Sequence, residues 1–107
     1  MPKKKPNQPK IVPAPPAHLS ERSKQLWIQL VGETKTPGRQ ALLQTALESL
    51  DRADECRNII NVEGLTVTSV KTGLSHSHPL LKVEKESRQL FTKIMNDLKL
   101  LFENPFQ

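Results

Sequence analysis

The chain has 107 residues, of which 36% are hydrophobic, and it carries a formal charge of +5. This length supports at most one domain, and a single cysteine excludes a disulfide framework, which favours a reducing, intracellular compartment. No apolar run approaches the ~20 residues of a membrane span, and the N-terminus lacks the apolar segment of a signal peptide, so we expect no membrane association.

A basic, proline-rich arm opens the chain. Residues 1–17 hold six of the nine prolines and four lysines, with no acidic residue among them. Such a segment buries too little apolar surface to offset its ordering entropy, so it is predicted to be disordered. Lys3, Lys4, Lys5 and Lys10 carry most of the net charge and are candidates for phosphate contact, with a solubilising tail as the alternative. Residues 18–107 are predicted to form one helical domain.

The first predicted helix begins after Ser20, whose hydroxyl can cap the free amides of the following turn. Leu26, Trp27, Leu30 and Val31 then recur at helical spacing, and Gly32 ends the pattern. We interpret Trp27 as an anchor of the core or of a subunit interface; stacking on a nucleic-acid base is the alternative.

The second predicted helix begins at Pro37, after the capping residue Thr36, and Gly64 ends it. Its apolar residues, which include Leu47, cover about half of the helix circumference. A three-helix monomer would not cover so wide a band, so we expect the chain to self-associate. Cys56 lies in this band and is interpreted as a buried, unreactive thiol.

A short β-hairpin or ordered loop is predicted between the second and third helices. Residues 65–70 alternate or are β-branched, residues 71–73 offer a turn, and residues 74–76 can return as a second strand. His76 and His78 could in principle share a metal ion, but no clear third and fourth ligand accompanies them. His78 and Pro79 are better explained as the start of the third helix.

The third predicted helix runs from Pro79 to about Glu103 and carries a wide apolar arc that includes Phe91, Ile94 and Leu98. Leu100 would point to the opposite, exposed side of this helix, and residues 104–107 are interpreted as a candidate docking peptide. The predicted fold class is therefore mainly α. Two long amphipathic helices flank a short β-hairpin or loop, a shorter helix precedes them, and the N-terminal arm is disordered.

Motifs for catalysis are missing from the sequence. It contains no G-x-x-x-x-G-K-[ST] phosphate loop, no G-x-G-x-x-G, no C-x-x-C and no H-E-x-x-H. The apolar faces of the predicted helices carry no polar constellation either. We therefore expect a binding protein without enzymatic activity, cofactor or metal.

The order of these features resembles the small subunit of tailed-phage terminase, in the variety that begins with a Pro-rich basic arm. The resemblance covers roughly residues 12–105. It rests on Pro15-Pro16-Ala17-His18-Leu19-Ser20 leading to Trp27, on Leu50 and Ala53, on Gly64-Leu65-Thr66-Val67, and on His78-Pro79.

The resemblance implies a non-enzymatic DNA-recognition subunit of a viral genome-packaging motor. Such proteins assemble as rings, bind double-stranded viral DNA and present it to a separate large subunit with ATPase and nuclease activities, in the cytoplasm of the infected bacterial host. In a ring, many weak basic patches act together, so avidity can replace strong single contacts. Two other interpretations stay open: a small helical transcriptional regulator that binds DNA as a dimer, and a structural adaptor whose arm contacts protein.

Candidate site residues fall into two sets. The candidates for DNA contact are Lys3, Lys4, Lys5, Lys10, Arg22, Lys24, Arg39 and Lys71. The candidates for the oligomer interface are Trp27, Leu47, Leu65, Val67, Val70, Phe91, Ile94 and Leu98. Because a two-stranded hairpin is marginal alone, its apolar residues are expected to contact a neighbouring subunit, while Lys71 stays accessible to DNA or to the large subunit.

Overall fold

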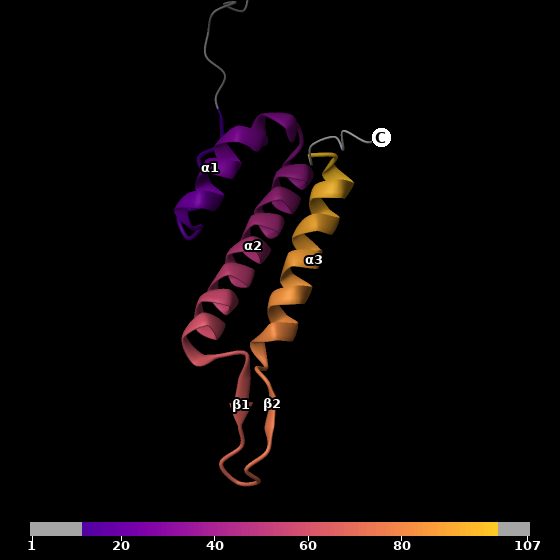
Figure 1. The fold of residues 1–107 in the computed structure, drawn as a ribbon. Coiled ribbons are helices and arrows are strands. Elements are labelled where there is room, and N and C mark those ends of the chain that lie inside the picture. Colours follow the sequence, from indigo (N-terminus) through magenta and orange to yellow (C-terminus); the bar gives the residue numbers. More distant parts are fainter. Residues whose placement is uncertain (1–11, 101–107) are drawn as a thin grey trace, which may run out of the picture.

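The structure of the protein is a computed structural model that describes residues 12–100. In chain order these form α1 (Glu21–Leu30), the 3-10 helix η1 (Val31–Glu33), α2 (Pro37–Glu63), strands β1 (Thr66–Thr68) and β2 (Ser75–Ser77), and α3 (Leu80–Leu98) (Figure 1). The predicted class is confirmed: the protein is mainly helical, with three helices and a short antiparallel hairpin between the two long ones.

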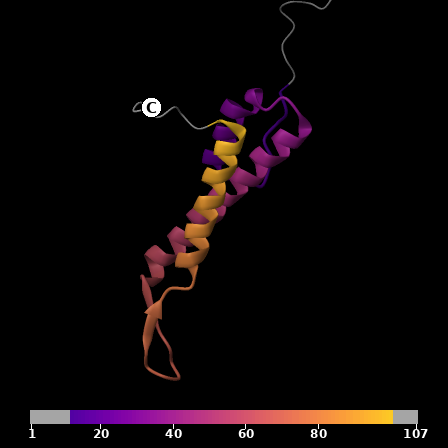
Figure 2. The same cartoon turned by 90° about the vertical axis from the view of Figure 1, so that its right-hand side faces the viewer.

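The long helices α2 and α3 pack side by side as an antiparallel pair, and α1 lies against the part of α2 nearer to Pro37 (Figures 1 and 2). The hairpin leaves the opposite end and extends the long axis of the pair. One hydrophobic cluster joins the three helices, and its buried members are Leu19, Trp27, Val31, Leu43, Ala46, Leu47, Ile94, Met95 and Leu98. Among the described residues, no further element lies beside the hairpin.

Side-chain caps begin α1 and α2 where the sequence predicted them. The Ser20 hydroxyl accepts from the N–H of Ser23 at 3.1 Å, and the Thr36 hydroxyl accepts from the N–H of Arg39 at 3.2 Å. Gly64 ends α2 with a φ of 95°, which side-chain-bearing residues rarely adopt. These local signals are confirmed because each acts within one turn of chain.

The first helix ends differently from its prediction. α1 stops at Leu30, and the chain tightens into η1, which contains Gly32. Val31 is buried in the core there, and the Thr34 hydroxyl donates to the Val31 carbonyl oxygen at 2.7 Å. Val31, the last apolar residue of the predicted pattern, is thus buried, and the 3-10 turn carries helical structure one residue past Gly32, to Glu33.

The third helix is shorter than predicted. Its expected continuation to Glu103 is wrong, because α3 stops at Leu98 and Lys99 adopts a left-handed conformation with a φ of 59°. The turn brings the N–H of Leu100 to 2.9 Å from the carbonyl oxygen of Met95 and packs the Leu100 side chain against the core. Leu100 therefore does not occupy the exposed side that a continued helix would give it. Residues 104–107, the candidate docking peptide, lie outside the described residues.

Candidate nucleic-acid and assembly surfaces

A buried tryptophan holds the end of the proline-rich arm. The indole nitrogen of Trp27 donates to the carbonyl oxygen of Pro13 over 2.8 Å, and Trp27 is only 4% exposed. Pro15 and Pro16 are half-buried. Residues 12–17, predicted as part of the disordered arm, therefore have a defined position in the structure. Because proline restricts the unfolded chain, this segment costs less entropy to order than its composition suggested.

Two of the candidate DNA-contacting residues on α1 already face opposite charges. Arg22 forms an ion pair with Asp54 of α2, and the ammonium of Lys24 lies 3.9 Å from the carboxylate of Glu21. Nearby carboxylates weaken the attraction of these cations for phosphate.

Two other candidates lie at opposite ends of the molecule. Arg39 is in the first turn of α2 and donates to the carbonyl oxygen of Leu98 over 2.7 Å, whereas Lys71 is exposed in the turn between β1 and β2. The hairpin that contains this turn lies at the far end of the α2–α3 pair (Figure 1). Most of the length of α2 separates Arg39 from Lys71, and the 27 residues of this helix span about 40 Å at 1.5 Å per residue. The structure therefore does not bring Arg39 and Lys71 together within one subunit. The arm candidates Lys3, Lys4, Lys5 and Lys10 lie outside the described residues.

Sequence reasoning missed two basic residues near Arg39. Lys35 lies just before α2 and Lys99 just after α3, and both side chains are exposed. Lys35 also lines a hollow of about 190 Å³ together with Val12 and Pro13. The sequence carries no signal for this grouping, because 59 residues separate Arg39 from its contact at Leu98.

A chain of alternating charges ties the three helices together. Arg57 donates to both carboxylate oxygens of Glu84, at 2.7 and 3.1 Å, and Arg88 donates to Glu84 at 3.1 Å and to Asp54 at 3.4 Å. The hydrogen bonds from Arg57 are the main reason why the pKa of Glu84 lies below its ordinary value, although burial raises it. Since Asp54 also holds Arg22, the network crosses from α3 over α2 to α1. Both of its acids are paired, so we interpret it as structural.

Asp51 fixes the start of α1 on α2. Its carboxylate accepts from the backbone N–H and the hydroxyl of Ser20, each at 2.7 Å, and from the hydroxyl of Ser23 at 2.6 Å. Burial raises the pKa of Asp51, but these hydrogen bonds outweigh that effect and lower it below its ordinary value. This cluster positions a helix and provides no nucleophile with a free base.

The candidate interface residues divide between core and surface. Four are buried in the core of the chain itself: Trp27, Leu47, Ile94 and Leu98. Phe91 is half-buried against the same core. Packing of α1 and α3 on α2 covers these five residues within one subunit, which leaves the buried four no surface for a second copy. The hairpin members behave differently: Leu65 and Val70 are exposed and Val67 is half-buried.

Exposed apolar side chains gather at the hairpin end. Nine large hydrophobic residues are exposed in the described part of the chain, and five of them lie within residues 59–74: Ile59, Val62, Leu65, Val70 and Leu74. Val70 is 100% exposed and Leu74 is 68% exposed. Sequence reasoning missed Ile59, Val62 and Leu74. An apolar residue shows in the sequence, but whether another element covers it does not.

Both outer edges of the hairpin offer free backbone groups. Antiparallel strands bond through alternate residue pairs, and here the N–H groups of His78 and Ser69 donate across the hairpin at 2.8 Å. The residues between the bonded pairs therefore direct N–H and C=O outward: Thr66, Thr68, Ser75 and Ser77. Within the described chain these groups make one contact: Nδ1 of His76 lies 3.1 Å from the carbonyl oxygen of Ser77. Neither edge carries the lysine or proline that commonly blocks strand addition.

The two histidines considered for a metal ion have separate surroundings. His76 is exposed on β2, whereas His78 is buried and contacts Glu63. Among residues 12–100 no group of three or more histidine, cysteine or acidic side chains is placed to hold a metal ion.

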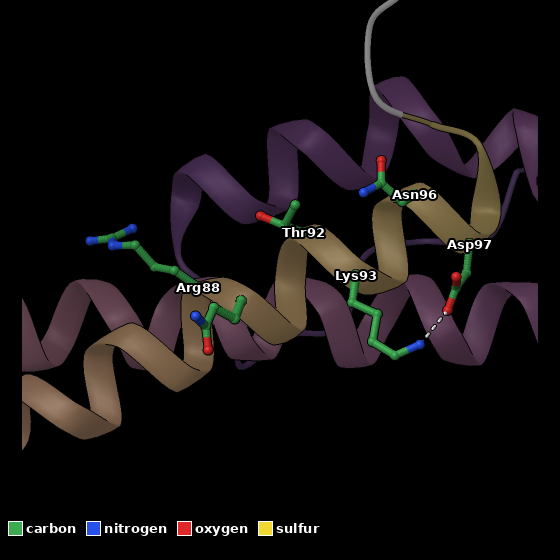
Figure 3. Close-up of a pocket in the computed structure, with 6 residues that line it drawn as sticks. Arg88, Thr92, Lys93, Asn96 and Asp97 are labelled. Atoms are coloured by element: carbon green, nitrogen blue, oxygen red, sulfur yellow. Dashed lines mark hydrogen bonds and ion pairs between the residues drawn. The ribbon is translucent and has the colours of Figure 1, made fainter.

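An open hollow of about 490 Å³ runs along the outer face of α3 (Figure 3). Its lining residues are Arg88, Gln89, Thr92, Lys93, Asn96 and Asp97. Lys93 and Asp97 form an ion pair of 3.2 Å one turn apart. The lining comes from one helix and lacks converging buried polar groups, so it has no catalytic arrangement.

No helix in the described residues combines the length and apolar character that a membrane crossing requires. Comparison with protein-family models, with curated proteins and with solved structures finds no match.

Proposed function

We propose that this chain is the small, DNA-binding subunit of a viral DNA-packaging terminase and that it works as a closed homo-oligomer. One observation carries the proposal: two separate surfaces lie at the two ends of the subunit. Trp27 holds Pro13, which follows the basic arm, at the end where α2 begins and α3 stops, called here the α1–α2 end. Exposed apolar residues gather at the hairpin end. A protein that binds DNA as an assembly needs both surfaces free at the same time. The resemblance of residues 12–105 to terminase small subunits supports the same assignment.

The free strand edges suit a head-to-tail ring. If neighbouring hairpins stand side by side and point the same way, β2 of one copy lies antiparallel to β1 of the next. The outward groups of Ser75 and Ser77 can then bond to those of Thr66 and Thr68 in the neighbour. This arrangement uses both edges of every hairpin, whereas two-fold pairing of β1 with β1 leaves the β2 edges free. Closure of the ring removes every free edge.

The hairpin also supplies an apolar face for assembly. Leu65, Val67 and Leu74 share one face, because residues alternate along a strand and paired residues lie on the same side. His76 lies on this face too, because it pairs with Val67. Side-by-side hairpins would join these faces into one surface on which apolar side chains flank His76. Lys71 is the only Lys, Arg, Asp or Glu between Gly64 and Pro79, so copies can approach here with little like-charge repulsion despite the net charge of +5.

In this proposal each subunit contributes one basic arm to a shared DNA-binding assembly. Many weak phosphate contacts then act together, and DNA is presented to a large subunit that carries the ATPase and nuclease activities. The setting is the cytoplasm of an infected bacterium. A dimeric helical regulator of transcription is the second candidate, and two-fold pairing of the β1 edges would favour it.

Light scattering on the purified protein tests the assembly. We expect a mass well above that of a dimer. Leu74→Asp places a charge on the apolar face of the hairpin and should reduce the mass to that of a monomer while helical circular dichroism is retained. Ile28→Asp, at an exposed apolar residue of α1, is the matched control and should leave the mass unchanged. A dimer in the unmodified protein would favour the regulator, and a well-folded monomer would contradict both candidates.

A further inference from the structure

We infer that the α1–α2 end of the subunit is its DNA-contacting surface, that the Trp27–Pro13 hydrogen bond holds the basic arm there, and that the hairpin tip takes no part. This inference rests on the proposed function and assigns its DNA contacts to one end of the molecule. The ligand chemistry is the phosphate backbone of duplex DNA.

The arm root, residues 12–13, has a fixed position on the subunit. Trp27 is part of the hydrophobic core, so its indole N–H is a fixed donor, and it binds the Pro13 carbonyl oxygen at 2.8 Å. Val12 and Lys35 line the same small hollow, together with Gly32. The described chain therefore begins beside the turn that joins η1 to α2.

The length of the chain limits how far the arm lysines can lie from Val12. An extended chain spans at most about 3.6 Å per residue, so Lys10 stays within about 7 Å of Val12 and Lys3 within about 32 Å. The hairpin tip lies beyond the far end of α2, which alone is about 40 Å long. The arm lysines of one subunit therefore cannot share a contact region with Lys71 of the same subunit.

Basic residues of the folded part lie near the arm root. Arg39 contacts the carbonyl oxygen of Leu98 at 2.7 Å, so the start of α2 meets the end of α3. Lys35 lies just before α2 and Lys99 directly follows Leu98, and both are exposed. The acidic residues of these segments are Glu33 of η1 and Asp97, and Asp97 is paired with Lys93. In the sequence, the segment that leads into this end carries four more lysines and no acidic residue.

Salt dependence of binding to a short fluorescent DNA duplex tests the inference. Each phosphate contact that is lost makes the plot of log affinity against log salt shallower by about 0.9. A Lys35→Gln, Lys99→Gln double variant should lower the slope by up to about 2, and conversion of Lys3, Lys4, Lys5 and Lys10 to glutamine by up to about 4. Lys71→Gln is the matched control at the hairpin tip and should leave the slope unchanged.

Trp27→Phe separates the anchoring of the arm from its charge. The ring stays in the core but the N–H donor is lost, so the arm must be ordered when DNA binds. We expect affinity to fall by on the order of 3-fold with the salt slope unchanged. Circular dichroism checks that helical content is retained.

Different outcomes bear on the two proposals separately. If the unmodified protein binds no duplex, the DNA-binding role in the proposed function is wrong. If it binds DNA but Lys71→Gln reduces the slope while the Lys35 and Lys99 changes do not, only the assignment to the α1–α2 end is overturned. Unchanged affinity in Trp27→Phe would overturn the anchoring role of Trp27.

Discussion

The imidazole of His78 and the carboxylate of Glu63 meet at the root of the hairpin, where Nε2 lies 2.6 Å from Oε1. The other ring nitrogen, Nδ1, accepts from the N–H of Leu80, the first residue of α3, at 3.1 Å. The backbone N–H of His78 donates to the carbonyl oxygen of Leu65 at 2.8 Å. One buried residue therefore joins the end of α2, the start of α3 and the hairpin.

Replacement of His78 by alanine should lower the free energy of unfolding by about 1–2 kcal/mol, because a helix-capping acceptor and the bond to Glu63 are both lost. Asparagine offers an acceptor oxygen close to the position of Nδ1, so His78→Asn should recover part of the loss. Urea unfolding at one fixed protein concentration measures both variants, since self-association makes stability depend on concentration. Equal stability of His78→Ala and the unmodified protein would show that these bonds contribute nothing net.

Gly64→Ala should destabilise the fold by about 1–2 kcal/mol, because the φ of 95° is strained for any residue with a Cβ. Steric clash is not the cause: the nearest atom to an added Cβ is the Thr66 carbonyl oxygen at 3.8 Å. Gly38→Ala is the matched control, because Gly38 lies in the first turn of α2 with no atom within 4 Å of an added Cβ. That change should be neutral or stabilising by up to about 1 kcal/mol. Thermal unfolding curves compare the two, and equal effects would contradict the backbone explanation.

Acidification should weaken the fold through Glu84. The hydrogen bonds from Arg57 hold the pKa of Glu84 below its ordinary value of 4.5. A carboxylate whose pKa is lower in the folded state contributes stability above its unfolded pKa, and that contribution is lost as the pH falls through the folded pKa. The free energy of unfolding should therefore decline from about pH 5 downward.

Two variants distinguish the contribution of Glu84 to this pH dependence from that of the other acidic residues. Glu84→Gln should show a shallower decline, with the remainder carried by groups such as Asp51, whose pKa is also lowered. Glu86→Gln, at an exposed carboxylate on the same helix, should keep the full decline. Urea unfolding between neutral pH and pH 3 provides the measurement, and identical slopes for the two variants would rule out the role of Glu84.

Leu98 should behave as a core residue rather than as an interface residue. It is 2% exposed, so Leu98→Ala should cost about 2–5 kcal/mol of unfolding free energy. Leu90 lies on the same helix but is 41% exposed, and Leu90→Ala should cost less than about 1 kcal/mol. Denaturant unfolding combined with light scattering distinguishes the two roles. Loss of oligomer mass in Leu98→Ala with an unchanged free energy of unfolding would contradict the core assignment.

Local signals in the sequence were enough to place most elements of the fold. Ser20 and Thr36 cap the helices that they were predicted to cap, and Gly64 ends α2. The alternation after Gly64 predicted the hairpin. These features depend on residues within one or two turns of chain, so they can be read without knowing what packs against them.

Tertiary packing decided which of the predicted apolar and charged residues are available for binding. The antiparallel packing of α2 and α3 buries Leu47 and Leu98 in the core but leaves Leu74 exposed. The same packing brings Arg39 to the end of α3 and places Lys71 at the other end of the molecule. Burial and charge pairing depend on which distant segments meet, and the hydrophobic pattern of a helix shows only that one of its faces must be covered.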